Sequence, residues 1–173
     1  MEYFELVERR HSVRAYLPKH VEDEAVQAIL SAANHAPSAG NLQAYEIYLV
    51  TQSSQRADLA KAALGQDFLA QAPLILVFCA HPARSAQRYG MRGADLYAVQ
   101  DATIACTFAM LAATARGLAS VWVGAFKEEA VHRVIQAPPE YRPVAILPIG
   151  YAAESPGATP RRSLSDLVHK LKD

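Results

Sequence analysis

Apolar and polar residues recur along this chain in two periods, which predict helices and strands in alternation. Residues 22–34 repeat apolar positions at one-face helical spacing, at Val26, Ile29, Leu30 and Ala33. Other helices are predicted at residues 2–9, 55–64, 95–116, 128–135 and 165–171. Strand composition marks residues 44–51, 74–79, 119–124 and 144–150. Short apolar strands that alternate with helices predict a sheet covered on both faces.

The helix over residues 95–116 is predicted to be apolar on nearly every side, and its stretch 102–115 carries no charge. Two interpretations stay open: a second subunit covers part of this helix, or it is the central helix of the core. The uncharged stretch is shorter than the roughly 20 apolar residues that cross a bilayer, so no membrane segment is expected. Gly117 is expected to end the helix.

Length, charge, cysteine positions and the N-terminal sequence indicate what kind of protein this is. The 173 residues show no boundary or repeat, so residues 1–173 are predicted to form one domain. Lys plus Arg and Asp plus Glu both count 17, which gives no overall field for nucleic acid or an anionic membrane. Cys79 and Cys106 lie in apolar sequence and are expected to be core residues in a reducing compartment. Because the N-terminus lacks a signal sequence, we expect a cytoplasmic protein.

Familiar catalytic signatures are missing from the sequence. There is no glycine-rich dinucleotide or phosphate loop, no His-Glu-x-x-His and no nucleophile elbow. The 6 histidines never stand three or four apart, so no metal site is expected. A chain with anion-binding loops but no evident acid, base or nucleophile would suit a bound organic cofactor that supplies the chemistry.

Four segments are candidates for binding such a cofactor. An extended backbone would turn Arg10, Ser12 and Arg14 to one side, where two guanidiniums and a hydroxyl can hold a phosphate; the alternative is a solvated basic turn. Residues 34–43 form a polar turn that offers Ser38, Asn41 and Gln43, or simply join a helix to a strand. Residues 121–126 end a strand in small residues whose amides could face a flat ring. Residues 160–163 add a second arginine pair for an anion; the alternative is a charge pair that is simply solvated.

In this order the segments resemble the flavin-dependent nitroreductase family from about Tyr3 to His169. The motifs that carry the resemblance are residues 10–16, residues 36–43, Asp101 in the long helix, residues 117–126 and residues 161–164. The resemblance implies an α+β fold in which helices cover a mixed sheet, a homodimer, and FMN held where the two subunits meet.

The resemblance also implies roles for individual residues. Arg10, Ser12 and Arg14, with His11 in the same motif, would hold the FMN phosphate and ribityl chain together with Arg161 or Arg162. Residues from the partner subunit would reach the flavin, namely Pro37, Ser38, Ala39 and Asn41. Backbone amides near Gly124 and Ala125 would face N5 and O4 of the flavin. The long helix would form much of the dimer interface, and no side chain would be catalytic.

The implied activity is a ping-pong reaction. NADH or NADPH would reduce the flavin, and a small planar acceptor such as a nitroaromatic or a quinone would then take the electrons. Two alternatives remain. One is another reduced-flavin enzyme of the same fold, such as a dehalogenase, a flavin-fragmenting enzyme or a dehydrogenase. The other is a non-catalytic module that binds FMN.

The sequence differs from longer family members in two places. It stops at Asp173, so we expect the dimer to depend more heavily on the helical interface. Residues 81–93 are short where larger relatives carry helices over the substrate pocket. Arg84, Arg88 and Arg92 stand four apart there and would form one basic face, either near the pocket for a nicotinamide phosphate or simply solvated.

Overall fold

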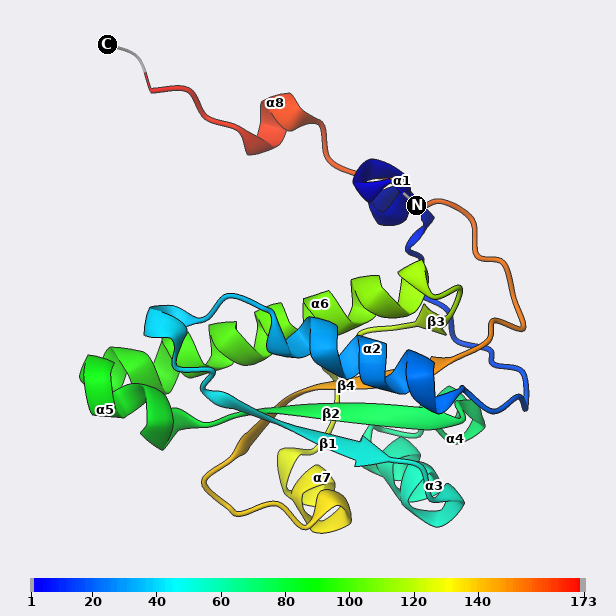
Figure 1. Cartoon of the computed structure of the whole chain (residues 1–173), viewed down its shortest axis with the longest axis horizontal. Helices are drawn as coiled ribbons and strands as arrows, with labels where there is room; N and C mark the ends of the chain where they lie inside the picture. The colour runs from blue at the N-terminus through cyan, green and yellow to red at the C-terminus, as the bar shows by residue number, and fades with distance from the viewer. Residues whose placement is uncertain (1, 172–173) are drawn as a thin grey trace.

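A computed structural model describes residues 2–171, and Figure 1 shows their arrangement. The longer helices are α1 (Tyr3–Arg9), α2 (Asp23–Asn34), α3 (Ser53–Ala62), α5 (Pro82–Arg92), α6 (Ala98–Ala115) and α7 (Glu128–Ile135). Shorter turns are η1 (Ala39–Asn41), α4 (Phe68–Gln71), η2 (Gly93–Tyr97) and α8 (Leu164–Leu167). The strands are β1 (Tyr45–Val50), β2 (Leu74–Ala80), β3 (Ala119–Ser120) and β4 (Arg142–Gly150).

The four strands form one sheet in the order β1-β2-β4-β3, and all three neighbouring pairs are antiparallel. A parallel bridge between Ser12 and Ser120 adds the N-terminal segment to the β3 edge, which makes the sheet mixed there. Although β3 itself is only two residues long, pairing with β4 resumes at Val123–Ile146 in the same register. The strand predicted over residues 119–124 is therefore present but interrupted.

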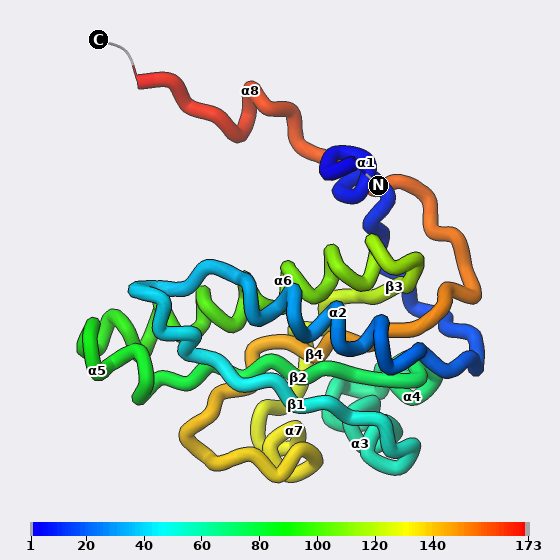
Figure 2. Tube along the Cα trace, in the orientation of Figure 1, coloured from blue at the N-terminus to red at the C-terminus, as the bar shows by residue number. Residues whose placement is uncertain are grey.

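Helices cover both faces of the sheet, which confirms the layered α+β prediction. β2 is buried along its whole length, and its residues alternate between two cores. Leu74, Leu76 and Phe78 pack with α2 and α6, whereas Ile75, Val77 and Cys79 pack with α3 and α7. Figure 2 follows the same layers along the Cα trace.

The long helix differs from the prediction at its start. A π-helical turn, η2, precedes α6, so regular α-helix begins at Ala98 rather than near Asp95. Its buried stripe is almost entirely small residues, which lets α6 approach the sheet closely. Gly117 adopts a φ of 73° and ends the helix, and Leu118 N–H donates to the Ala113 carbonyl at 2.9 Å.

Together α5, η2 and α6 make a helical run, Pro82–Ala115, that is long and apolar enough to cross a membrane by length and composition. That run extends well beyond the uncharged stretch considered in the sequence. In the structure α6 packs against α2, β1, β2 and β4, and the carboxylate of Asp101 accepts backbone hydrogen bonds inside the protein. One side of α6 is thus packed as a core helix, while Phe108 on the same helix stays exposed.

Two short helices, α8 and α4, differ from the sequence prediction. The C-terminal helix expected over residues 165–171 contracts to α8, and residues 157–171 are exposed throughout. The four-residue α4 was not predicted, because one turn is too short to show a helical period.

Cys79 and Cys106 are buried free thiols, as expected, and burial raises the pKa of Cys79 to about 12.

Candidate functional site

The segment Arg10–Arg14 lies extended along the β3 edge of the sheet. The N–H of Val13 donates to the carbonyl of Ser120 at 3.2 Å, next to the Ser12–Ser120 bridge. Val13 is buried while Ser12 and Arg14 are exposed, which is the alternation that an extended backbone imposes. Arg10 is half-buried and shares the side of Ser12 and Arg14 by that alternation. His11 is on the other side and lines a hollow of about 300 Å³ with Arg9.

Tyr16 fixes the end of this segment from inside the protein. It is 5% exposed, and its hydroxyl donates to the carbonyl of Val13 at 2.8 Å. Burial raises the pKa of Tyr16 well above its usual value, so the hydroxyl stays a donor. Ala153 N–H donates to the carbonyl of Ala15 at 2.9 Å, and a Glu154 carboxylate oxygen accepts the Arg14 N–H. The backbone of the segment Arg10–Arg14, called the cradle below, is thus held between β3 and the chain that follows β4.

Gly124 and Ala125 are exposed on the same run of chain that pairs with Ser12. Val123, just before them, exchanges two hydrogen bonds with Ile146 at 2.9 and 3.0 Å. The carbonyl of Ala125 accepts from the Gln66 side chain at 3.1 Å. Gly124 lies four residue steps beyond Ser120, which in extended chain is roughly 13 Å. The structure therefore brings the first and third predicted segments together on one edge.

The loop over residues 36–43 is tied to α6 by Asp101. This carboxylate is 2% exposed and accepts the N–H of Ala39 at 2.9 Å and the N–H of Ala44 at 3.3 Å. Ser38 Oγ accepts the Gln43 N–H at 3.0 Å, which closes the loop on itself. Gly40, Asn41 and Gln43 all have positive φ, between 48° and 58°, a conformation that costs energy for the two non-glycine residues.

A pocket of about 540 Å³ lies between this loop and the N-terminal half of α6. Pro37, Ser38 and Ala39 line one side, and the helix side presents Tyr97, Val99, Gln100, Asp101, Thr103 and Ile104. The walls are mostly apolar with a few polar groups, which suits a flat organic ring. Asn41 is exposed and lies outside the lining.

The two halves of the predicted site lie at opposite ends of α6 in a single chain (Figure 1). Asp101 ties the loop to the first turn of the helix, and Ser12 bridges to Ser120 just beyond its last turn. The 18 residues of α6 span about 27 Å. One chain therefore does not bring Pro37, Ser38, Ala39 and Asn41 near Arg10, Ser12 and Arg14.

Arg161 and Arg162 lie in the exposed C-terminal arm. The guanidinium of Arg162 donates to the carbonyl of Asp166 at 2.8 Å. Among residues 2–171, no hydrogen bond or ion pair links either arginine to the segment around Arg10 and Arg14. Within that described part of the chain, the structure thus shows no direct bond between the second arginine pair and the first segment.

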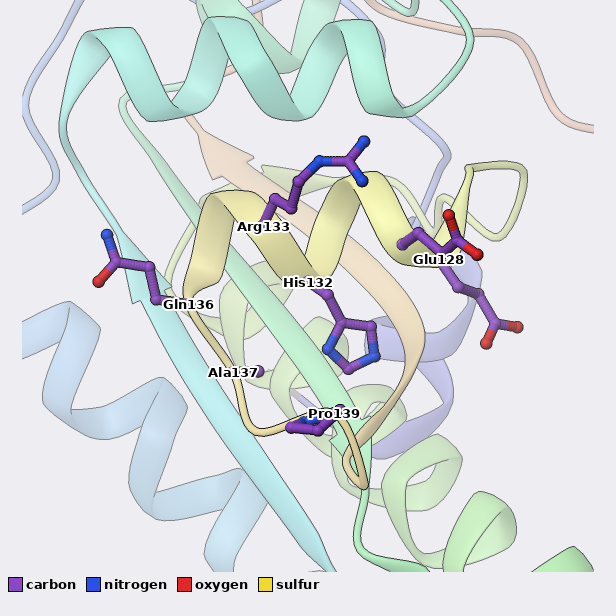
Figure 3. A pocket seen from close by; sticks show the side chains of 7 residues that line it. Glu128, His132, Arg133, Gln136, Ala137 and Pro139 are labelled. Carbon is purple, nitrogen blue, oxygen red and sulfur yellow. The ribbon is translucent and has the colours of Figure 1, made fainter.

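Another hollow, of about 640 Å³, lies beside α7 (Figure 3). Glu128, His132, Arg133 and Pro139 border it, and none of the predicted site residues does. His132 Nδ1 is buried without a hydrogen-bond partner in the described part of the chain. Residues 2–171 contain no cluster of three or more His, Cys, Asp or Glu that could hold a metal ion.

Sequence reasoning gave Asp101 no role, although it placed this residue among the motifs. The signal was available, because Asp101 is the only charge between Asp95 and Arg116 in an otherwise apolar helix. An acid at such a position needs partners, and the structure supplies two backbone N–H groups from a loop about 60 residues away. Tyr97 and Gln100 are pocket residues that no local pattern indicated.

Comparison with known proteins identifies the class to which this fold and these segments belong. A model of the Nitroreductase family matches residues 7–66 and 60–151. The chain therefore belongs to the Nitroreductase family. It is similar to the oxygen-insensitive NADPH nitroreductase of Salmonella typhimurium, with 30% identity over 173 residues, 96% of this chain and 72% of that protein.

Two further relatives extend the comparison. The NADH dehydrogenase of Thermus thermophilus is 29% identical over 187 residues, which cover 92% of this chain and 91% of that protein. The solved structure of the NADPH:FMN oxidoreductase from Vibrio harveyi complexed with NAD+ matches with a TM-score of 0.88 and 26% identity. That match covers 96% of this chain and 76% of the other.

Proposed function

We propose that this protein is an FMN-dependent oxidoreductase that takes electrons from NADH or NADPH and passes them to a small planar acceptor, such as a nitroaromatic or a quinone. Family membership and the flavin and nicotinamide names of its relatives support this class. The observation that carries the proposal is the basic segment Arg10–Arg14, which exposes Ser12 and Arg14 and pairs with the edge that continues to Gly124 and Ala125.

The residues on this edge fit FMN. Arg10, Ser12 and Arg14 supply two cations and a hydroxyl for a phosphate at one end. Gly124 and Ala125, about 13 Å further along the strand, expose backbone where a flat ring can approach. Glu154 adds a carboxylate beside the cradle, where it accepts the backbone N–H of Arg14 and leaves the guanidinium to the ligand. When bound, FMN supplies the hydride chemistry at its N5 atom.

A second subunit would complete this site. Because the loop and the cradle lie at opposite ends of α6, two such helices packed side by side in opposite directions would place the loop of one chain beside the cradle of the other. Pro37, Ser38, Ala39 and Asn41 would then line the cofactor from the partner. In this homodimer the residues of the two chains bind and orient the ligands. The nucleotide and the acceptor use the same pocket one after the other, which is a ping-pong order.

Exposed apolar residues support that assembly. Phe108 on α6 is 37% exposed, and Tyr3, Phe4 and Val7 of α1 are also exposed large apolar residues. The C-terminal arm adds Leu164, Leu167, Val168 and Leu171 as it leaves the body of the protein (Figure 1). Large apolar side chains that one chain leaves exposed favour burial against a second copy.

The function is tested by colour and by anaerobic reduction. We expect the purified protein to be yellow with one FMN per chain, and either NADH or NADPH to bleach its visible absorption under anaerobic conditions. A quinone added afterwards should restore the colour, with parallel initial-rate lines that indicate ping-pong order. Bound flavin that neither nucleotide reduces would overturn the enzymatic proposal in favour of an FMN-binding module.

The shared site predicts that Phe108→Glu separates the subunits. A charge at this exposed position would be desolvated in the interface. We therefore expect the wild type to sediment at twice 18.8 kDa and the variant as a monomer that has lost most of its FMN. Leu49→Glu, on the outer strand β1 and 48% exposed, is the matched control and should leave both properties unchanged. A Phe108→Glu protein that stays dimeric would contradict the α6 interface.

A further inference from the structure

We propose that Arg84, Arg88 and Arg92 form an anion-binding face that receives a phosphate group of the nicotinamide nucleotide at the mouth of the pocket. This inference rests on the proposed function, because it concerns how the electron donor is selected at that same pocket. The three guanidiniums are called the α5 basic face below. Every member is exposed, and the four-residue spacing places Arg84 and Arg88 on one side of α5. Arg92 follows a kink at Gly90, which has a φ of 56°, so its place beside the other two depends on its own contacts.

The α5 basic face borders the loop that lines the pocket. Arg84 Nε donates to the carbonyl of Leu42 at 2.5 Å. A Cβ atom added at Gly40 would lie 2.8 Å from Nη1 of Arg88, so that guanidinium rests against the loop backbone. Arg92 Nε donates to the hydroxyl of Tyr97 at 3.0 Å, and Tyr97 itself lines the pocket. Whichever subunit supplies the loop to a pocket therefore also supplies these arginines.

The charges on this face are not neutralised by the protein. Among residues 2–171, none of the three arginines lies within ion-pair distance of a carboxylate. Arg84 and Arg92 each use one N–H on neutral oxygen atoms, which fixes the side chains and leaves the positive charge for a ligand. The guanidinium of Arg88 lies 5.4 Å from the centre of the Tyr89 ring. Among residues 2–171 it donates no hydrogen bond to another protein atom. Arg88 is thus the member with most donors open.

The charge of the electron donor, NADH or NADPH, matches the α5 basic face. NADH carries a pyrophosphate, and NADPH carries an additional 2′-phosphate, whereas nitroaromatic and quinone acceptors need no charge. Guanidinium forks bind phosphate oxygens through paired hydrogen bonds, and an electropositive rim also raises the rate of encounter with an anion. Three arginines beside an apolar pocket therefore favour a ligand with a flat ring inside and phosphate outside.

The test compares wild type, Arg88→Ala, Arg88→Lys and Arg133→Ala as holoproteins. Arg133 is the matched control, because it is an exposed arginine on α7 beside the separate hollow of Figure 3. KM and kcat are measured for NADH and NADPH with a saturating quinone. Binding of adenosine 2′,5′-bisphosphate and of ADP is measured by calorimetry, and FMN content by absorbance.

We expect Arg88→Ala to raise KM for the nucleotide roughly 10-fold with kcat within twofold, and to weaken binding of the corresponding probe by the same factor. Arg88→Lys should retain part of the affinity, and Arg133→Ala all of it. A rise confined to NADPH and adenosine 2′,5′-bisphosphate assigns the 2′-phosphate to this face. Equal rises for both nucleotides, with weaker ADP binding, assign the pyrophosphate.

Two results would overturn the inference. One is KM and probe binding in Arg88→Ala that equal those of Arg133→Ala. The other is a fall in kcat and FMN content without a change in probe binding, which would mean that Arg88 only supports the loop. Both differ from failure of the proposed function, which would appear as wild-type protein that holds no FMN or is not reduced by either nucleotide. The calorimetric titration decides the α5 basic face even in that case.

Discussion

Replacing Arg14 with alanine should weaken FMN binding roughly 10- to 150-fold. The guanidinium is exposed beside Ser12 on the cradle side of the segment, and a charge-assisted hydrogen bond to phosphate contributes about 1.5–3 kcal/mol. The backbone should not change, because the Arg14 N–H bond to Glu154 does not use the side chain. The dissociation constant can be measured by titrating FMN into flavin-depleted protein and following quenching of flavin fluorescence.

Arg9→Ala provides the control for that experiment. Arg9 is one register position outside the cradle and pairs with Glu5 at 3.5 Å on the exposed surface of α1, a contact that contributes little. We expect its dissociation constant to stay within threefold of wild type. Equal losses of FMN affinity in Arg9→Ala and Arg14→Ala would show that total positive charge matters and the two-residue spacing does not.

Asp101→Asn should lower the free energy of unfolding by about 2–4 kcal/mol. The carboxylate is almost fully buried and accepts the N–H groups of Ala39 and Ala44 with separate oxygens. An amide keeps the shape but has only one oxygen, so its NH₂ group would face one of these donors and leave it unsatisfied. The single tryptophan, Trp122, provides a fluorescence signal for urea unfolding.

The same substitution should also loosen the pocket loop. Asn41 and Gln43 hold positive φ values that the surrounding hydrogen bonds maintain, and loss of the Asp101 contacts removes part of that restraint. We expect faster amide hydrogen exchange over residues 38–44. Asp95→Asn, an exposed acid just before α6, is the control and should change neither stability nor exchange. Unchanged exchange in Asp101→Asn would contradict the tethering role.

Much of the secondary structure could be predicted because it depends on local patterns. The buried strand β2 was visible as an unbroken apolar run, and α2 as an apolar repeat of helical period. For the segment at Arg10–Arg14 the spacing indicated only that an extended backbone would turn its polar side chains to one side, and the bridge to Ser120 supplies that extended form. One-turn elements such as α4 carry no period, and the end of α8 depends on contacts that local sequence does not contain. Those were therefore missed or placed wrongly.

The candidate site divides in the same way. Motifs named most of its residues, since side-chain chemistry is written in the sequence itself. They did not show that Asp101 holds the loop, or that Tyr97 and Gln100 line the pocket, because these contacts join segments far apart in the chain. The arginines of α5 stood out by their spacing, yet only their contacts with Leu42 and Tyr97 place them at the pocket.

By itself the sequence determined the alternation of helices and strands, the absence of net charge and the basic segment at Arg10–Arg14, because local periodicity and composition fix these properties. Only the tertiary structure decided that Ser12 meets Ser120 and that the loop is bound to the far end of α6. Such contacts are selected by packing of the whole chain, through burial and hydrogen bonding between distant residues. They explain physically why one chain holds two separate halves of a site.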